Sequence, residues 1–173
     1  MNKVTDQPLF PSAIRFGIIG GLIAIVYSLI IFMTGQIANP AIGIIGMLLY
    51  PIIVYLAIKS LRTAQGEHIS FGKALGVGTL ACAIAGLMSG LFQYVYLNFI
   101  DPAAIDEIVN ASLEMMESFG TPEDVMEEAA ESTRNGYTLV RSTASGLGMG
   151  AFLGLIVSLI AGAIMKKEAP INV

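Results

Sequence analysis

Charged residues are scarce in this sequence. Only 13% of its 173 residues are charged, against roughly 25% in an ordinary soluble domain. Hydrophobic residues make up 55%, and the mean hydropathy is +0.75. A soluble fold of this length could not hide so much apolar surface from water. The composition therefore indicates an integral membrane protein.

Cysteine and histidine are nearly absent, with one of each. Cys82 has no partner for an internal disulfide, and its apolar surroundings are typical of a small packing residue. His68 stands beside Glu67, and a single histidine supports neither a metal site nor a catalytic triad. No basic patch indicates nucleic-acid binding. We therefore expect no catalytic residue, no cofactor, no bound metal and no enzymatic activity.

Four continuous apolar runs dominate the chain: residues 16–33, 41–58, 74–100 and 144–165. A membrane-spanning helix needs about 20 such residues, so the predicted fold class is an all-α membrane protein with four transmembrane helices. The first run is longer than the apolar part of a signal peptide and has no clean cleavage site after it, so we expect an uncleaved helix. No run contains Asp, Glu, Lys, Arg or His, and such residues usually mark transport paths.

Basic residues predict the orientation, because cytoplasmic segments of membrane proteins are enriched in lysine and arginine. Seven of the nine bases fall in three regions that four spans would place on one side, namely Lys3 and Arg15, then Lys59, Arg62 and Lys73, then Lys166 and Lys167. Arg134 and Arg141 fall on the other side. We therefore expect a multi-pass protein of a bacterial inner membrane, with both termini in the cytoplasm.

These patterns divide the chain into five segments. We expect a disordered cytoplasmic N-terminus over residues 1–13 and transmembrane helices one to three over residues 14–100. An acidic extracytoplasmic helical hairpin is expected over residues 101–136. A fourth transmembrane helix over residues 137–167 and a cytoplasmic tail over residues 168–173 complete the chain.

The predicted hairpin holds ten of the thirteen acids, between Asp101 and Glu131. Prolines after Asp101 and Thr121 are typical of helix starts, and Gly120 and Gly136 are typical of helix ends. At helical spacing, apolar residues share one face of each helix: Ile105, Ile108, Val109, Leu113, Met116 and Phe119, then Val125, Met126, Ala129 and Ala130. The opposite face of the second helix is a candidate partner surface, made of Glu123, Asp124, Glu127, Glu128 and Glu131. A merely solvated face and a loose cation site are the alternatives.

Small residues recur at every fourth position in the last two apolar runs. Because lipid gives helices no hydrophobic reason to associate, such stripes indicate close helix packing. The candidate packing residues are Gly86, Gly90, Gly146, Gly150, Gly154 and Ser158. The stripe fits either a neighbouring helix of the same chain or a second copy in a homo-oligomer.

Gln93 is one of the few notably polar side chains in the apolar runs, and we expect it to make an interhelical hydrogen bond. Its alternative role is in a water-filled path with Ser89 and Tyr94, in an oligomer. Arg141 lies one turn from the last apolar run, and we expect it to snorkel or to pair with an acid of the hairpin.

Several of these segments resemble a known family. The segments are residues 69–78 before the third run, residues 99–102 after it, the acidic Met/Glu segment and the glycine-rich last run ending at Lys167. From about Ala13 to Lys167 the chain is similar to the bacterial family known as domain of unknown function 4199. The resemblance implies a small four-helix inner-membrane protein of the Bacteroidota type, and it supplies no activity and no site residues.

Two functions remain open from the sequence. The first is a non-enzymatic interaction or scaffold subunit, whose acidic hairpin docks on a membrane or periplasmic protein. The second is a small transporter or channel subunit that acts as an oligomer. The absence of charge in the apolar runs favours the first, and in both cases the lipid bilayer is the immediate partner.

Overall fold

The computed structural model describes residues 8–37 and 39–167. Within these residues the chain is all-helical, with no β-strand. Seven α-helices and one π-helical turn follow one another: α1 (Phe10–Met33), α2 (Pro40–Met47), α3 (Leu49–Ala64), α4 (Phe71–Val95), η1 (Tyr96–Ile100), α5 (Ala104–Ser118), α6 (Glu123–Arg134) and α7 (Leu139–Met165).

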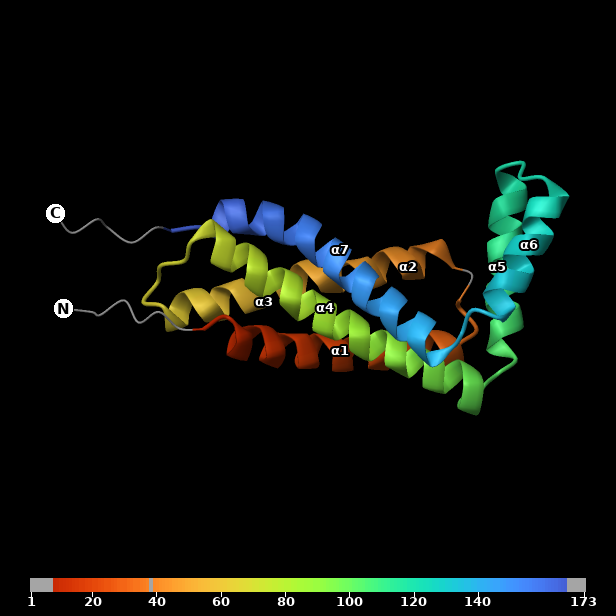
Figure 1. Cartoon of the computed structure of the whole chain (residues 1–173), viewed down its shortest axis with the longest axis horizontal. Helices are drawn as coiled ribbons and strands as arrows, with labels where there is room; N and C mark the ends of the chain where they lie inside the picture. The colour runs from red at the N-terminus through yellow and green to blue at the C-terminus, as the bar shows by residue number, and fades with distance from the viewer. Residues whose placement is uncertain (1–7, 38, 168–173) are drawn as a thin grey trace.

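The long helices form a bundle, and α5 and α6 lie side by side across one end of it (Figure 1). The start of α1, the connection from α3 to α4 and the end of α7 share the opposite end. Four segments are long and apolar enough to cross a membrane: Phe10–Met33, Ala41–Ala64, Phe71–Ile100 and Leu139–Met165. The prediction of an all-α fold with four such helices is confirmed.

The first helix begins earlier than predicted. Residues 10–13, assigned to a disordered segment, form the first turn of α1. Pro11 is compatible with this position, because the N–H that proline lacks would have no helical partner there. The rest of that predicted segment up to residue 7, and the predicted tail over residues 168–173, lie outside the described residues.

The second apolar run, predicted as one helix, is broken at Leu48 into α2 and α3. Pro51 explains the break, because it cannot donate a hydrogen bond to the carbonyl of Met47 and its ring would press against that carbonyl. A new helix starting at Leu49 places Pro51 in a first turn, where no such bond is needed. As a result of the break, α2 packs on α1 and α3 but has no extensive contact with α4 or α7.

The helices α4 and α7 form the closest pair in the molecule. A Cβ atom added at Gly86 would collide with the carbonyl oxygen of Gly146, and one added at Gly150 would collide with the carbonyl oxygen of Cys82. Two backbones can approach this closely only where side chains are absent. The neighbouring helix is therefore α7 of the same chain, one of the two alternatives that the stripe left open.

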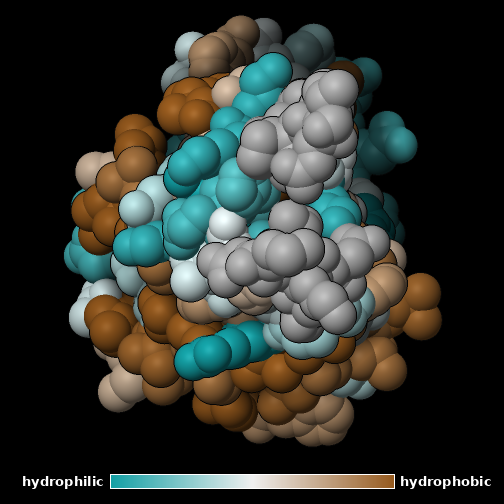
Figure 2. Space-filling view, turned by 90° about the vertical axis from the view of Figure 1, so that its left-hand side faces the viewer, coloured by the Kyte–Doolittle hydropathy of each residue, from teal (hydrophilic) through white to brown (hydrophobic). Residues whose placement is uncertain are grey.

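The larger cluster of buried apolar side chains fills the half of the bundle next to the start of α1 and the end of α7, here called the packed half. A smaller cluster around Tyr96 and Leu97 lies at the other end, where the bundle meets α5. Val54, Ile58, Leu61 and Val77 are fully buried there. Viewed onto this end, hydrophilic residues gather near the centre and hydrophobic residues lie along the rim (Figure 2). Exposed apolar side chains line the flanks of the bundle, among them Leu22, Val26, Ile30, Phe152, Ile160 and Ile164, as expected for helices that face lipid.

Candidate functional site

The half of the bundle next to α5 and α6, here called the hollow half, contains a hollow beside the small buried cluster around Tyr96 and Leu97. A polar cavity of about 190 Å³ lies where α4, α6 and α7 meet. Its lining consists of Gln93, Ser132, Thr133, Gly136, Tyr137, Arg141, Ser142 and Ser145. A middle cavity of about 270 Å³ shares Gln93 and Ser145 with it and reaches Ser28 and Tyr50 deeper in the bundle. The two cavities are therefore adjoining parts of one hollow.

An apolar cavity of about 540 Å³ continues the hollow toward the side of the bundle. It shares Ser28, Tyr50, Ser89 and Met149 with the middle cavity. Most of its remaining lining is apolar: Ala24, Tyr27, Ile31, Gly43, Gly46, Met47, Leu49, Ile53, Ala85 and Leu153. The break at Leu48 creates this space, because it carries α2 away from α4 and α7.

Two of the side chains that line the polar cavity lack hydrogen-bond partners. The hydroxyl oxygen of Ser142 is buried and makes no hydrogen bond within the described chain. The Gln93 side chain has no hydrogen bond to any described residue, so the predicted interhelical bond is not formed. A buried polar group without a partner costs about 1–3 kcal/mol. Water or a polar ligand in this cavity would therefore be stabilised.

Arg141 lies at the edge of the polar cavity and reaches across to α6. Its Nη1 and Nη2 atoms donate to the carbonyl and hydroxyl oxygens of Ser132, at 3.4 and 3.3 Å. No carboxylate of the described residues pairs with it, so of the two predicted alternatives the ion pair with an acid is absent. By contrast, Arg134 pairs with Asp106 of α5 at 3.2 Å. The guanidinium of Arg141 thus keeps an uncompensated positive charge beside the cavity.

The connection from α6 to α7 is held in place by η1, the turn that follows α4. Asn98, in the π-helical turn η1, donates from Nδ2 to the carbonyl oxygen of Tyr137 at 2.9 Å. Burial raises the pKa of the Tyr137 hydroxyl above its ordinary value, and the nearby charge of Arg141 opposes the shift. The hydroxyl therefore stays protonated near neutral pH and can donate a hydrogen bond into the cavity.

The hollow ends where the packed half begins. Val54, Val77 and Ala81 are fully buried between α3 and α4, and none of them lines a cavity. The described residues therefore form a recess that opens toward α5 and α6 and toward the side of the bundle. They do not form a continuous pore in this conformation.

A family model described as "Protein of unknown function (DUF4199)" matches residues 15–167. The chain belongs to this family. The resemblance drawn from the sequence is thereby confirmed. No curated protein and no solved structure matches the chain. Because the description of DUF4199 names no activity, the function of this member has to be inferred from its own residues.

The structure brings the predicted packing residues of this DUF4199 chain together along α4 and α7. A Cβ atom at Gly90 would meet the carbonyl of Ser142, and one at Gly146 would meet the carbonyl of Gly86. Toward the packed half, Gly154 faces Cys82. In the same half, Ser158 faces Gly78. Gly86, Gly90 and Gly146 also line the middle cavity, so the same contact forms one of its walls.

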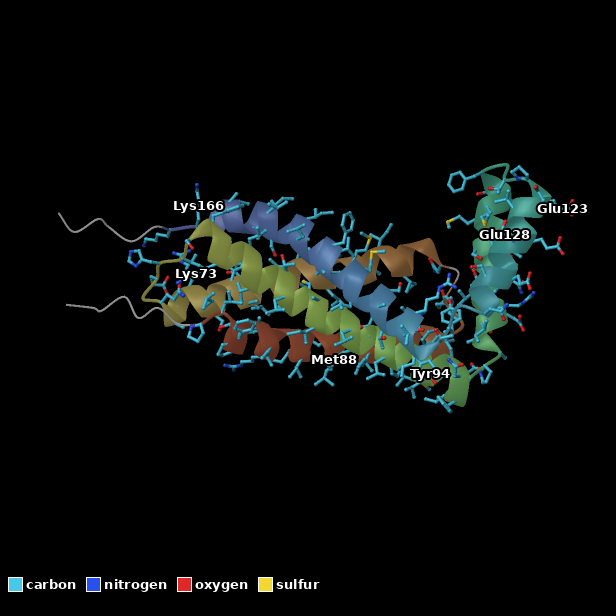
Figure 3. All side chains as sticks on the ribbon, in the orientation of Figure 1. Lys73, Met88, Tyr94, Glu123, Glu128 and Lys166 are labelled. Atoms are coloured by element: carbon cyan, nitrogen blue, oxygen red, sulfur yellow. The ribbon has the colours of Figure 1, made fainter. Side chains whose placement is uncertain are left out.

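The five acids proposed as a partner surface all lie exposed on α6. Glu123 and Glu128 lie at the end of the molecule beyond the bundle (Figure 3). None of the five acids forms an ion pair with a described residue. Within the same residues, no group of three His, Cys, Asp or Glu side chains is close enough to hold a metal ion.

The start and the end of α5 differ from the prediction. The helix begins at Ala104 with no side-chain cap, so Asp101 is not its N-cap. The turn is made by the backbone instead, through bonds to the carbonyls of Asp101 and Pro102. Phe119, assigned to the apolar face of α5, is 81% exposed because it follows the last helical residue.

The structure places two of the three residues of the predicted water-filled path at one cavity. Gln93 and Ser89 both line the middle cavity, whereas Tyr94 packs its ring edge-on against Phe99 and lines none of the cavities. Sequence reasoning missed Ser28, Ser142 and Ser145. A spacing of three or four residues, as in Ser89–Gln93 and Ser142–Ser145, places polar groups on one helix face. This spacing could have indicated Ser142 and Ser145, but it does not indicate Ser28.

Proposed function

We propose that this DUF4199 protein binds a small molecule within the membrane, in the hollow formed by α1, α2, α4 and α7. The joined cavities, with the unpartnered Ser142 hydroxyl and the uncommitted Gln93 amide, carry the proposal. Ligand sites are concave and mostly apolar, with a few convergent polar groups that fix orientation. The three cavities together have this character.

Binding is a better account of the hollow than conduction or catalysis. The packed half closes it at one end, which leaves no pore through the described residues. Among the described residues that line the polar cavity, none is a histidine or carboxylate that could activate a serine. The chain is therefore proposed to hold a molecule, and not to conduct or convert it.

The bacterial inner membrane, with both termini in the cytoplasm, is the location that we propose. Lys73 and Lys166 lie at the end of the packed half, and Glu123 and Glu128 lie at the other end (Figure 3). This charge separation supports the orientation, because basic residues gather on the cytoplasmic side. The hollow would then open toward the periplasmic face, with α5 and α6 as a helical hairpin above it.

Native mass spectrometry of the protein purified in mild detergent tests the binding proposal. Ser145→Phe should fill the junction of the polar and middle cavities and remove small-molecule adducts that the unaltered protein carries. Phe152→Leu, on an exposed side of α7, is the control and should leave these adducts in place. Equal adducts on the protein and on Ser145→Phe would reject the proposal.

A second candidate function is the interaction subunit predicted from the sequence. The five exposed and unpaired acids on α6 support it, since a like-charged face is suited to a basic partner. Affinity purification in mild detergent, with identification of co-purifying proteins, tests it. Changing Glu127, Glu128 and Glu131 together to Gln should release such a partner. Retention of every co-purifying protein would exclude the acidic face as the docking surface.

A further inference from the structure

We propose that the molecule bound in the hollow is an anionic membrane lipid, with its head group in the polar cavity beside Arg141 and one acyl chain in the apolar cavity. This inference rests on the proposed binding function and names its ligand class. Four observations carry it: the gradient of polarity along the hollow, the charge of Arg141, the opening toward lipid and the size of the apolar cavity.

The hollow is polar at one end and apolar at the other. Hydroxyl, amide and guanidinium groups from Gln93, Arg141, Ser142 and Ser145 surround the polar cavity. The apolar cavity is walled mainly by aliphatic side chains, including Ile31, Ile53 and Leu153. A wholly polar solute would leave the apolar cavity empty, and a hydrocarbon would leave the Ser142 hydroxyl without a partner. An amphiphile satisfies both parts.

Arg141 selects the sign of the head group. Among the residues that the structure describes, it is the only charged side chain that lines any of the three cavities. Its two bonds to Ser132 are long, at 3.4 and 3.3 Å, and involve neutral acceptors. Guanidinium groups bind phosphate and carboxylate through paired, charge-assisted hydrogen bonds. An anion on the head group would replace weak contacts by strong ones. Arg141 and the acids of α6 are all solvent-exposed, so salt screens both the attraction of the guanidinium for an anion and the repulsion by the acids.

The apolar cavity opens toward the lipid between α2 and α7. Met47 on α2 and Met149 on α7 both line this cavity, and they are 53% and 56% exposed at the surface. Methionine side chains are flexible and adapt to irregular apolar ligands. Since α2 makes no extensive contact with α7, an acyl chain can pass between these side chains directly from the bilayer.

The size of the apolar cavity fits a chain and not a second protein helix. Its volume of about 540 Å³ falls within the range of roughly 300–1,000 Å³ that is usual for small-ligand sites. A hydrogen bond from the Tyr27 hydroxyl to the carbonyl oxygen of Ile42 joins α1 to α2 across one side of it. The opening is thereby restricted to the side between α2 and α7.

The full-length protein can be titrated with soluble single-chain lipids and followed by native mass spectrometry. Lysophosphatidylglycerol, which is anionic, should bind about tenfold more tightly than zwitterionic lysophosphatidylcholine, as expected for a charge-assisted contact. Arg141→Gln should abolish this preference. Arg134→Gln, which removes the arginine already paired with Asp106, should leave it unchanged. Inorganic phosphate alone should not displace the lipid.

A second pair of variants tests the site of the acyl chain. Gly43 lines the apolar cavity, and a side chain added there meets open space. Gly43→Leu should therefore weaken the binding of both lipids without disturbing the fold. Gly148 is equally open but lines no cavity, so Gly148→Leu should have no effect. An unchanged affinity in Gly43→Leu, or displacement by phosphate, would overturn the placement of the chain.

The outcomes separate this inference from the proposed function. Equal binding of the two lipids, with loss of both in Ser145→Phe, would refute the anionic preference and leave small-molecule binding intact. Binding of neither lipid, together with other adducts lost in Ser145→Phe, would refute the lipid as ligand only. Binding that Ser145→Phe does not affect would refute both.

Discussion

The two halves of the bundle share α1, α4 and α7, but the remaining position is filled by α3 in one half and by α2 in the other. In the packed half, α3 fills the space beside α4 with Val54, Ile58 and Leu61. In the hollow half, α2 occupies the corresponding position and leaves the space open. The contact between α4 and α7 runs through both halves. Closing the bundle therefore depends on where α2 and α3 lie, and one break at Leu48 decides it.

The proposed orientation of the two halves in the membrane can be tested by an experiment with an all-or-none result. In a Cys82→Ala background, Glu117→Cys should react with an impermeant thiol reagent on intact spheroplasts, and Gly66→Cys should not. The reason is the concentration of bases at the end that contains Gly66. Labelling at position 66 with protection at position 117 would invert the topology and place the hollow toward the cytoplasm.

The contact that both halves share should be the most sensitive to added volume. Gly150→Leu forces a side chain against the backbone of α4 near Cys82, and we expect it to lower the free energy of unfolding by about 3 kcal/mol. Gly148→Leu, on the open side of the same helix, is the matched control. Denaturation in detergent measures both. Similar small effects would mean that α4 and α7 do not pack through their backbones.

Truncating apolar side chains should distinguish the halves directly. Ile58 is fully buried in the packed half, so Ile58→Ala should cost about 2–5 kcal/mol. Ile31 lines the apolar cavity, so Ile31→Ala enlarges an existing space and should cost less than about 1 kcal/mol. Equal losses in the same unfolding assay would show that the hollow half is as tightly packed as the other.

Removing the proline should reduce the difference between the halves. Pro51→Ala restores an N–H that can bond to the carbonyl of Met47, and α2 and α3 can then form one straight helix. We expect the unfolding free energy to change by about 1 kcal/mol or less. Thiol labelling of Gly43→Cys should nevertheless slow as the apolar cavity narrows. An unchanged labelling rate would show that the apolar cavity does not depend on Pro51.

The smallest effect is expected outside the bundle. Asp106→Asn removes the ion pair with Arg134 that joins α5 to α6. Both side chains are more than half exposed, so the pair should contribute less than about 0.5 kcal/mol. Amide hydrogen exchange over α5 and α6 should remain almost the same. A large loss of protection would show that this pair holds the two helices together.

The long helices were predictable because an apolar run of spanning length has few other stable structures in a bilayer. The break at Leu48 was not, although Pro51 is in plain view. Proline is tolerated in membrane helices when neighbouring groups satisfy the freed carbonyl, so its presence alone does not distinguish an intact helix from a broken one. That distinction depends on tertiary contacts.

The serines that line the polar cavity could not be predicted from the sequence for a related reason. Ser142 and Ser158 occupy equivalent positions in one stripe of small residues, and the sequence treats them alike. In the structure Ser158 faces Gly78 of α4, whereas Ser142 borders a cavity formed with residues of α6 and the loop after it. The placement of α6 over the start of α7 therefore distinguishes a serine that borders a cavity from one that packs against a glycine.

The pairing of α4 with α7 also sets the order of events during synthesis. A membrane protein is made from its N-terminus, so α4 is complete well before α7 leaves the ribosome. Until then Gly86 and Gly90, which face only α7, have no partner within the chain. The nascent protein must therefore wait for its last helix before its tightest contact forms. Chains that stop before Leu139 would carry an unmatched surface for membrane quality control to recognise.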